Sequence, residues 1–201
     1  FLVPGKFIRE DIPRAVEEAK WRYPQIEFAL AEPFGDHPAL AVLVVKRGRG
    51  NREQGAGNRE QGTGRQGDTE TGNYKTNQGL LLMAHGSPFP EANAAIYAVA
   101  ERAQGLGHYH RVAVSFLGLN EPDIPTAIAD LVDQGCTQIA AVPYFLQLGG
   151  HVAEDLPAII AAARGHHPHT DIRLTDHLGY DPLFVEVIAE RVAQRGQGSG
   201  V

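Results

Sequence analysis

Between residues 80 and 195, short apolar runs alternate with longer segments of helical periodicity. The run Leu80–Ala84 contains only apolar residues, which is typical of a central strand buried on both faces. Strands that alternate with helices form a parallel sheet through right-handed crossovers. The sequence therefore predicts an α/β fold with a parallel sheet. Further strands are predicted at 111–117, 138–145 and 171–175, and helices at 90–104, 121–134, 152–164 and 181–194.

The segment 47–79 separates the predicted domain 80–195 from the segment 1–46. It is rich in Gly, Asn, Gln, Arg and Glu, and it contains the sequence Gly-Asn-Arg-Glu-Gln-Gly twice. Such a composition cannot bury enough apolar area to offset the entropy lost on ordering, so it favours a flexible linker. The Gly-rich tail 196–201 is expected to be disordered.

Residues 1–46 resemble the last part of the domain 80–195. When each residue is set against the residue 144 positions later, 11 of the first 38 positions are identical. An internal duplication explains this match, so the parent is expected to be a two-repeat protein. Residues 1–46 would be the C-terminal half of a degenerate first repeat, with a loop, a helix, a strand and a helix. Phe7 stands where the second copy has His151.

Two histidines follow strand ends of the predicted sheet. His85 comes directly after the first strand, and His151 comes shortly after the third. Ligands of parallel sheets bind beyond the carboxyl ends of the strands, and neutral imidazole suits Co²⁺, Fe²⁺, Ni²⁺ and Zn²⁺. We therefore predict that His85 and His151 share a divalent metal ion, with open coordination positions. The neighbouring glycines are expected to allow tight turns and to leave room for a bulky ligand; they are Gly86, Gly149 and Gly150.

Other interpretations of these residues remain open at this point. A single histidine at a strand end is more often a capping or hydrogen-bonding residue than a ligand. Ser87 is predicted to cap the following helix rather than to act as a nucleophile, because the pattern Gly-x-Ser-x-Gly is absent. A different α/β enzyme with His85 as its base would have no cofactor, since no dinucleotide fingerprint or P-loop is present.

Four short motifs follow one another along the domain 80–195. They are Met83-Ala84-His85-Gly86-Ser87, Val114-Ser115-Phe116-Leu117 with Glu121-Pro122, Val142-Pro143-Tyr144-Phe145-Leu146 with Gly149-Gly150-His151, and Glu154-Asp155-Leu156-Pro157. In this order and spacing they resemble the class II chelatases, the sirohydrochlorin cobaltochelatases and ferrochelatases. The resemblance implies the parallel-sheet chelatase fold, which is flavodoxin-like with one sheet between two layers of helices. It also implies insertion of Co²⁺ or Fe²⁺ into sirohydrochlorin, in cobalamin or siroheme biosynthesis. It implies no permanently bound cofactor, because the metal is a substrate.

The resemblance also implies site residues. The two motif histidines of the family, which bind metal and act in catalysis, fall on His85 and His151. Gly118 stands where the family commonly has a glutamate. That departure and the incomplete first repeat leave open an alternative, a non-catalytic metal-binding or assembly module derived from the same fold. Candidate substrate-binding residues are Ser87, Phe89, Glu121, Tyr144, Phe145, Leu146, Gly149 and Gly150.

Composition limits the partners. The net charge of −6 does not favour a nucleic-acid partner, and no apolar run approaches the roughly 18 residues of a membrane span. The single cysteine, Cys136, excludes an intramolecular disulfide and a Cys-rich zinc site, and a buried reduced thiol is expected. We therefore expect a cytoplasmic protein. The resemblance to the chelatases implies that it binds a tetrapyrrole, with a homodimer or packing of the two repeats completing the cleft.

Overall fold

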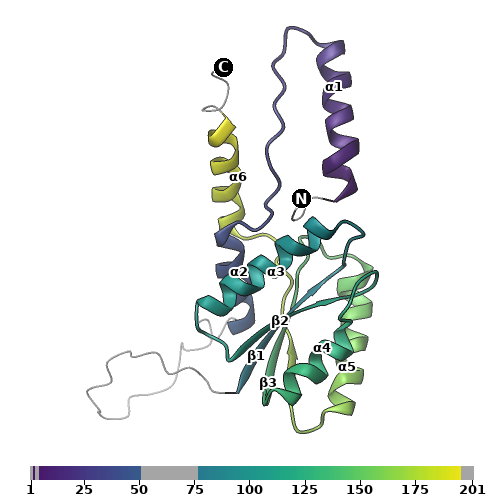
Figure 1. Ribbon diagram of the computed structural model, residues 1–201, viewed down its shortest axis with the longest axis vertical. Helices are drawn as coiled ribbons and strands as arrows, with labels where there is room; N and C mark the ends of the chain where they lie inside the picture. The colour runs from purple at the N-terminus through teal and green to yellow at the C-terminus, as the bar shows by residue number, and fades with distance from the viewer. Residues whose placement is uncertain (1, 3–4, 51–76, 196–201) are drawn as a thin grey trace, which may run out of the picture.

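A four-stranded, entirely parallel sheet organises the chain (Figure 1). The computed structural model describes residue 2, residues 5–50 and residues 77–195. The strand order is β2-β1-β3-β4, so the carboxyl ends of β1 and β3 lie side by side. This sheet confirms the predicted α/β class. The strands are β1 (Gln78–Ala84), β2 (Arg111–Phe116), β3 (Gln138–Pro143) and β4 (Asp171–Leu174).

Helices cover both faces of the sheet, which gives the predicted three layers. Helices α2 and α3 pack on one face, and α4 and α5 pack on the other. No helix among the described residues is long and apolar enough to cross a membrane. The helices are α1 (Ile12–Arg22), α2 (Pro38–Arg49), α3 (Pro90–Gly105), α4 (Ile124–Asp133), α5 (Leu156–His166) and α6 (Pro182–Arg195), and π-helical turns at Phe7–Asp11 and His151–Asp155 lead into α1 and α5.

The two faces of β1 explain its uninterrupted apolar sequence. Leu80 and Leu82 point into the core beneath α2 and α3, whereas Leu81 and Met83 point into the core beneath α4 and α5. All four side chains are fully buried, because successive residues of a strand face opposite sides of the sheet. The predicted burial of Cys136 is also confirmed, and burial raises the pKa of its thiol.

Helix α2 is part of the core that the strands and helices after residue 76 form. Leu43 and Val44 are completely buried, and Gly48 packs so closely that a Cβ there would overlap Leu80 and the Tyr109 hydroxyl. This packing extends α2 to Arg49, past the predicted linker start at residue 47. At the other end, strand pairing extends β1 back to Gln78. Residues 51–76 of the predicted linker and the predicted tail 196–201 lie outside the described residues.

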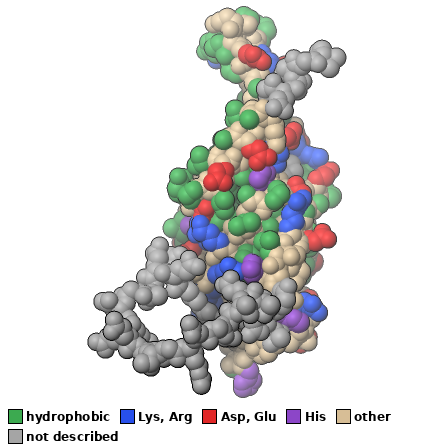
Figure 2. Space-filling view, turned by 90° about the vertical axis from the view of Figure 1, so that its left-hand side faces the viewer, with side chains coloured by type: hydrophobic (Ala, Val, Ile, Leu, Met, Phe, Trp, Pro, Cys, Tyr) green, Lys and Arg blue, Asp and Glu red, His purple; other side chains and the backbone are tan. Residues whose placement is uncertain are grey.

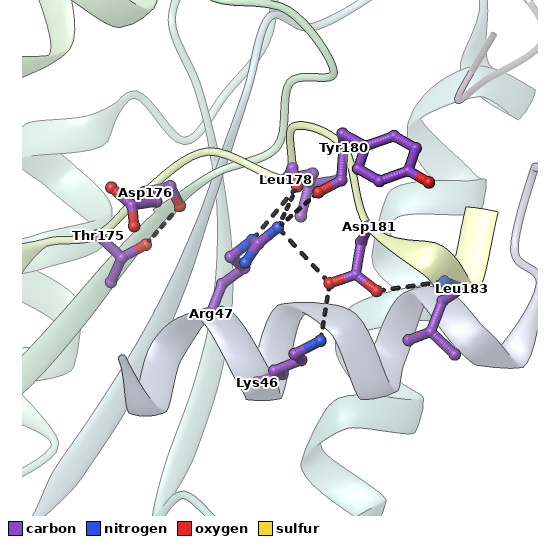
Figure 3. A network of polar contacts seen from close by, with 8 residues as sticks. All are labelled: Lys46, Arg47, Thr175, Asp176, Leu178, Tyr180, Asp181 and Leu183. Atoms are coloured by element: carbon purple, nitrogen blue, oxygen red, sulfur yellow. Dashed lines mark hydrogen bonds and ion pairs between the residues drawn. The ribbon is translucent and has the colours of Figure 1, made fainter. Parts of the chain in front are cut away.

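A polar network fastens α2 to the loop before α6 (Figure 3). Arg47 donates hydrogen bonds to the carbonyl oxygens of Leu178 and Tyr180, and Lys46 Nζ donates to Asp181 Oδ2 at 2.8 Å. Asp181 Oδ1 accepts from the Leu183 amide at the start of α6. The Asp181 side chain is only 4% exposed, so it needs these partners.

Replacing Asp181 by asparagine is expected to lower the free energy of unfolding by about 2 kcal/mol at pH 7. Burial raises the pKa of Asp181, but hydrogen bonds from Lys46 and Leu183 and the charges of Lys46 and Arg47 outweigh it, so the pKa is lowered overall. Because the pKa is lowered in the folded state, the ionised carboxylate stabilises the fold at pH values above the ordinary pKa of about 3.9. This stabilisation is lost as the pH falls through the folded-state pKa.

Urea unfolding of the wild type and Asp181→Asn at pH 7 and pH 3 measures this contribution. The variant keeps an amide able to cap α6, so the comparison isolates the charge. The difference between the two proteins should shrink at pH 3. An equal difference at both pH values would contradict the ionic contribution.

The segment that precedes α2 is less well packed than the rest. Helix α1 has no fully buried residue, and Trp21 is 84% exposed. The strand expected between α1 and α2 is absent from the described residues; this part is extended and has no neighbouring strand to pair with. Figure 1 shows the stretch that joins α1 to α2 running between α1 and α6, beyond the end of the sheet.

Candidate functional site

The structure brings the two predicted histidines together. His85 directly follows β1, and His151 begins the π-helical turn that follows β3. Their imidazole rings lie with centroids 5.2 Å apart and planes at 63°. The proximity follows from the topology, because β1 and β3 are neighbours and both end at the same edge of the sheet.

Both rings have a hydrogen-bond partner at Nδ1. His151 Nδ1 lies 2.7 Å from Asp155 Oδ2, and His85 Nδ1 lies 3.3 Å from the Gly86 carbonyl oxygen. An acceptor at Nδ1 favours the tautomer with a proton there, which leaves the Nε2 lone pair available on each ring. No group of three or more His, Cys, Asp or Glu side chains suited to a metal occurs among the described residues. The pair therefore offers two nitrogen ligands and leaves the other coordination positions open.

A cavity of about 500 Å³ lies beside His85. Five of the predicted site residues line it: His85, Ser87, Tyr144, Phe145 and Leu146. Gly86, which was expected to leave room for a ligand, lines it as well. Sequence reasoning did not single out the remaining lining residues as part of the site; they are Leu2, Ala84, Asn93, Ile96 and Gln147.

Gly86 is the glycine that the backbone of the site requires. Its φ is +87°, and a Cβ there would lie 2.6 Å from the Gly118 carbonyl oxygen and from Asn120 Oδ1. Asn120 Oδ1 in turn accepts a hydrogen bond from the Ser87 amide at 2.7 Å. Gly118 itself has open space around its Cβ position, so the glycine there is not imposed by packing.

Replacing Gly86 by alanine is expected to lower the free energy of unfolding by about 2 kcal/mol and to reduce activity at least tenfold. The methyl group requires both an unfavourable backbone conformation and a shift of the loop that holds Ser87. Gly165→Ala is the matched control, because that glycine lies in α5 with open space around it. Thermal unfolding and activity assays check the result, and a Gly86→Ala protein indistinguishable from the control would contradict it.

Several predictions around the histidines need correction. Ser87 is not the N-cap of α3: that position is Phe89, and the Ser87 hydroxyl instead accepts from the Phe89 amide at 3.1 Å. Gly149 and Gly150 do not have positive φ, so neither is needed for a tight turn. Gly150 has helical dihedral angles, because it immediately precedes the π-helical turn. The space around both glycines is open.

His151 and four of the predicted substrate-binding residues do not line the cavity; the four are Phe89, Glu121, Gly149 and Gly150. The Arg9 guanidinium lies over the Phe89 ring, with Arg9 Cζ 5.4 Å from the ring centroid. Glu121 Oε2 accepts a hydrogen bond from the Asp123 amide at 3.0 Å, in the loop before α4. Asp123 then caps α4 by accepting from the Thr126 amide, which lowers the pKa of Asp123. The structure thus gives Glu121 a place in a loop that leads into a helix.

Comparison with known proteins gives consistent matches. The profile of the CbiX family matches residues 1–50 and 79–195. A sirohydrochlorin cobaltochelatase from Methanothermobacter thermautotrophicus is 35% identical over 135 residues, which cover 60% of this chain and 94% of that protein. A sirohydrochlorin ferrochelatase from Bacillus subtilis is 30% identical over 119 residues, which cover 59% of this chain and 46% of that protein.

The fold is similar to a solved structure described as SirB from Bacillus subtilis with Fe³⁺. The match has a TM-score of 0.76 at 20% sequence identity, and it covers 98% of this chain and 71% of the other. The similarity of fold therefore extends beyond the domain that carries the two histidines and includes the segment before the linker.

Proposed function

The chain belongs to the CbiX family, and on that premise we propose that it inserts a divalent metal, Co²⁺ or Fe²⁺, into sirohydrochlorin. Such a reaction serves cobalamin or siroheme biosynthesis, and we place it in the cytoplasm. The observation that carries the proposal is the pair of imidazole rings 5.2 Å apart beside a largely apolar cavity.

His85 and His151 would hold the metal ion through Nε2. Only two protein ligands hold the ion, so it remains free to pass to the four nitrogens of the tetrapyrrole. The protein thus treats the metal as a substrate and not as a resident cofactor. Borderline ions such as Co²⁺ and Fe²⁺ suit imidazole, and the site geometry does not favour either ion.

The reaction also requires bases, because the tetrapyrrole loses two pyrrole N–H protons when the metal enters. An imidazole accepts a proton only at a free nitrogen, so each ring would accept one at Nε2 once the ion has passed to the tetrapyrrole. The Asp155 carboxylate would fix the orientation of the His151 ring through the bond at Nδ1, whereas the His85 ring has only the Gly86 carbonyl there.

The macrocycle would bind with one part in the cavity. Phe145 and Leu146 are half-buried and would contact its apolar face, and Ser87 and Tyr144 would contact it from the same cavity. The open space around Gly149 and Gly150 would admit the ring beside His151. Phe89 and Glu121 would have to contact the part of the tetrapyrrole that extends out of the cavity.

Metal insertion can be followed directly by absorbance. The protein is mixed with metal-free sirohydrochlorin and Co²⁺ or Fe²⁺, and the rate is compared with a mixture that lacks the protein. We expect a clear acceleration with at least one metal. A folded protein that gives only the uncatalysed rate with both metals would overturn the proposal.

We also propose that residues 1–46 are the C-terminal half of a degenerate first repeat. In support, helices α1 and α5 begin and end at matched positions of the two aligned copies, as do the π-helical turns before them. Gly35 and Gly179 also stand at matched positions, with φ of +58° and +55°. Helix α2 of the first unit packs on the sheet of the second, which is a direct contact between the two.

A second α/β unit, from the same chain or another copy, would cover exposed apolar residues of α6. Val185, Ile188 and Val192 are each more than half exposed on this helix. Figure 2 shows apolar side chains among charged ones on the side of the molecule where α6 lies. Light scattering tests the homodimer version: twice the mass of one chain supports it, and a single-chain mass at high concentration contradicts it.

A further inference from the structure

Two buried polar atoms of the cavity lack a hydrogen-bond partner within the described part of the chain. They are the Tyr144 hydroxyl and Asn93 Oδ1. Tyr144 follows β3 and is only 4% exposed, and Asn93 lies in the first turn of α3. Buried polar atoms in proteins are nearly always paired, so two unpaired atoms in one cavity indicate a ligand that pairs with them.

The surroundings of each atom indicate a hydrogen bond that it can make. Burial, reinforced by the Asp36 carboxylate, raises the pKa of Tyr144, so its hydroxyl stays neutral and can donate. Asn93 Nδ2 donates to the Ser87 carbonyl at 2.9 Å, which sets the orientation of the amide. Asn93 Oδ1 is therefore the free acceptor, so the ligand must supply a donor to Asn93, and the Tyr144 hydroxyl can donate to an acceptor of the ligand.

A metal-free tetrapyrrole has both a donor and an acceptor. It is the substrate of the proposed function, so the inference rests on that function. It carries N–H donors at its centre and carboxylate acceptors on its side chains. We propose that Asn93 Oδ1 accepts a hydrogen bond from a pyrrole N–H, and that the Tyr144 hydroxyl donates to a side-chain carboxylate. Asn93 is held by Ser87, which closely follows His85 in the chain, and all three residues line the cavity.

This assignment gives Asn93 a role that changes during the reaction. When the metal enters, the two pyrrole protons leave, and the product has no N–H to donate to Oδ1. Asn93 therefore binds the substrate better than the product and favours product release. Tyr144 contacts a group that the reaction does not alter, so it binds both forms equally.

The test measures dissociation constants for metal-free sirohydrochlorin and cobalt sirohydrochlorin by absorbance titration, without turnover. Tyr144→Phe should weaken binding of both forms about tenfold, the effect of one lost hydrogen bond. Asn93→Leu should weaken binding of the metal-free form about tenfold and leave that of the cobalt form within twofold. Tyr97→Phe is the matched control, because Tyr97 lies on α3 with an exposed side chain and should change neither constant.

The Asn93→Asp variant separates the effect of the acceptor oxygen from the effect of the hydrogen bond to the Ser87 carbonyl. Both Asn93→Leu and Asn93→Asp lose the bond to Ser87, but only aspartate keeps an acceptor, so only Asn93→Asp should keep the preference for the metal-free form. Tyr144→Phe should unfold at no lower temperature than the wild type, because its hydroxyl has no partner to lose. Equal weakening of both forms by Asn93→Leu, or unchanged binding in Tyr144→Phe, would overturn the inference. Failure of the proposed function would show differently, as a wild type that binds sirohydrochlorin but inserts no metal.

Discussion

Replacement of either His85 or His151 by alanine is expected to lower the rate of metal insertion about a thousandfold. On the proposed mechanism each change removes a metal ligand and a proton acceptor together, and general-base catalysis alone contributes about 10²- to 10⁴-fold. Because both histidines are proposed to serve the same metal ion, the double variant should be hardly slower than the single ones. Insertion of Co²⁺ at saturating sirohydrochlorin measures the effect.

The histidine variants should fold as the wild type does. Both side chains are exposed, so their loss removes little buried area, and the temperature of unfolding should stay within about 2 °C. His169→Ala is the matched control, since His169 lies exposed in the loop before β4. Single variants that retain a third or more of the wild-type rate would show that the ring pair is not the reaction centre.

Replacing Leu43 by alanine is expected to lower the free energy of unfolding by about 3 kcal/mol. Leu43 is completely buried in the core beneath α2 and α3, so its removal leaves a cavity. The effect would show that α2 stabilises the domain on the far side of the linker. Chemical denaturation of the full chain gives the value.

A matched control comes from the helix that corresponds to α2 in the second unit. Ile188 of α6 is the residue aligned with Val44 in the duplication, but it is 52% exposed whereas Val44 is fully buried. Ile188→Ala should therefore cost less than about 0.5 kcal/mol in the isolated chain. A cost below about 1 kcal/mol for Leu43→Ala would contradict the packing of α2 on the sheet.

The sequence predicts most of the fold because its apolar periodicity is strong after residue 79. The run Leu80–Ala84 and the three later strands appear at the expected places, with ends that differ by a few residues. The packing of α2 was not predictable in the same way. Its contacts with β1 and β3 join residues that are far apart in the sequence, and periodicity within one helix does not specify a distant partner.

The candidate site was predictable where it depended on topology and motifs. His85 and His151 follow neighbouring strands, so the parallel sheet alone brings them to one edge. Asn93 was missed because an asparagine in the first turn of a helix has many ordinary roles, and only the cavity around it shows that Oδ1 lacks a partner. The tight turn assigned to Gly149 and Gly150 failed because the helical conformation begins one residue before His151.

The Co²⁺ environment in the wild type, read by X-ray absorption spectroscopy, tests the central claim most directly. With tetrapyrrole absent and metal below the protein concentration, we expect two imidazole nitrogens at about 2.1 Å, with the other ligands from solvent. His85→Ala and His151→Ala should each reduce the imidazole contribution from two to one. A cobalt spectrum without imidazole, or one that neither substitution changes, would contradict metal binding by the pair and with it the proposed chelation.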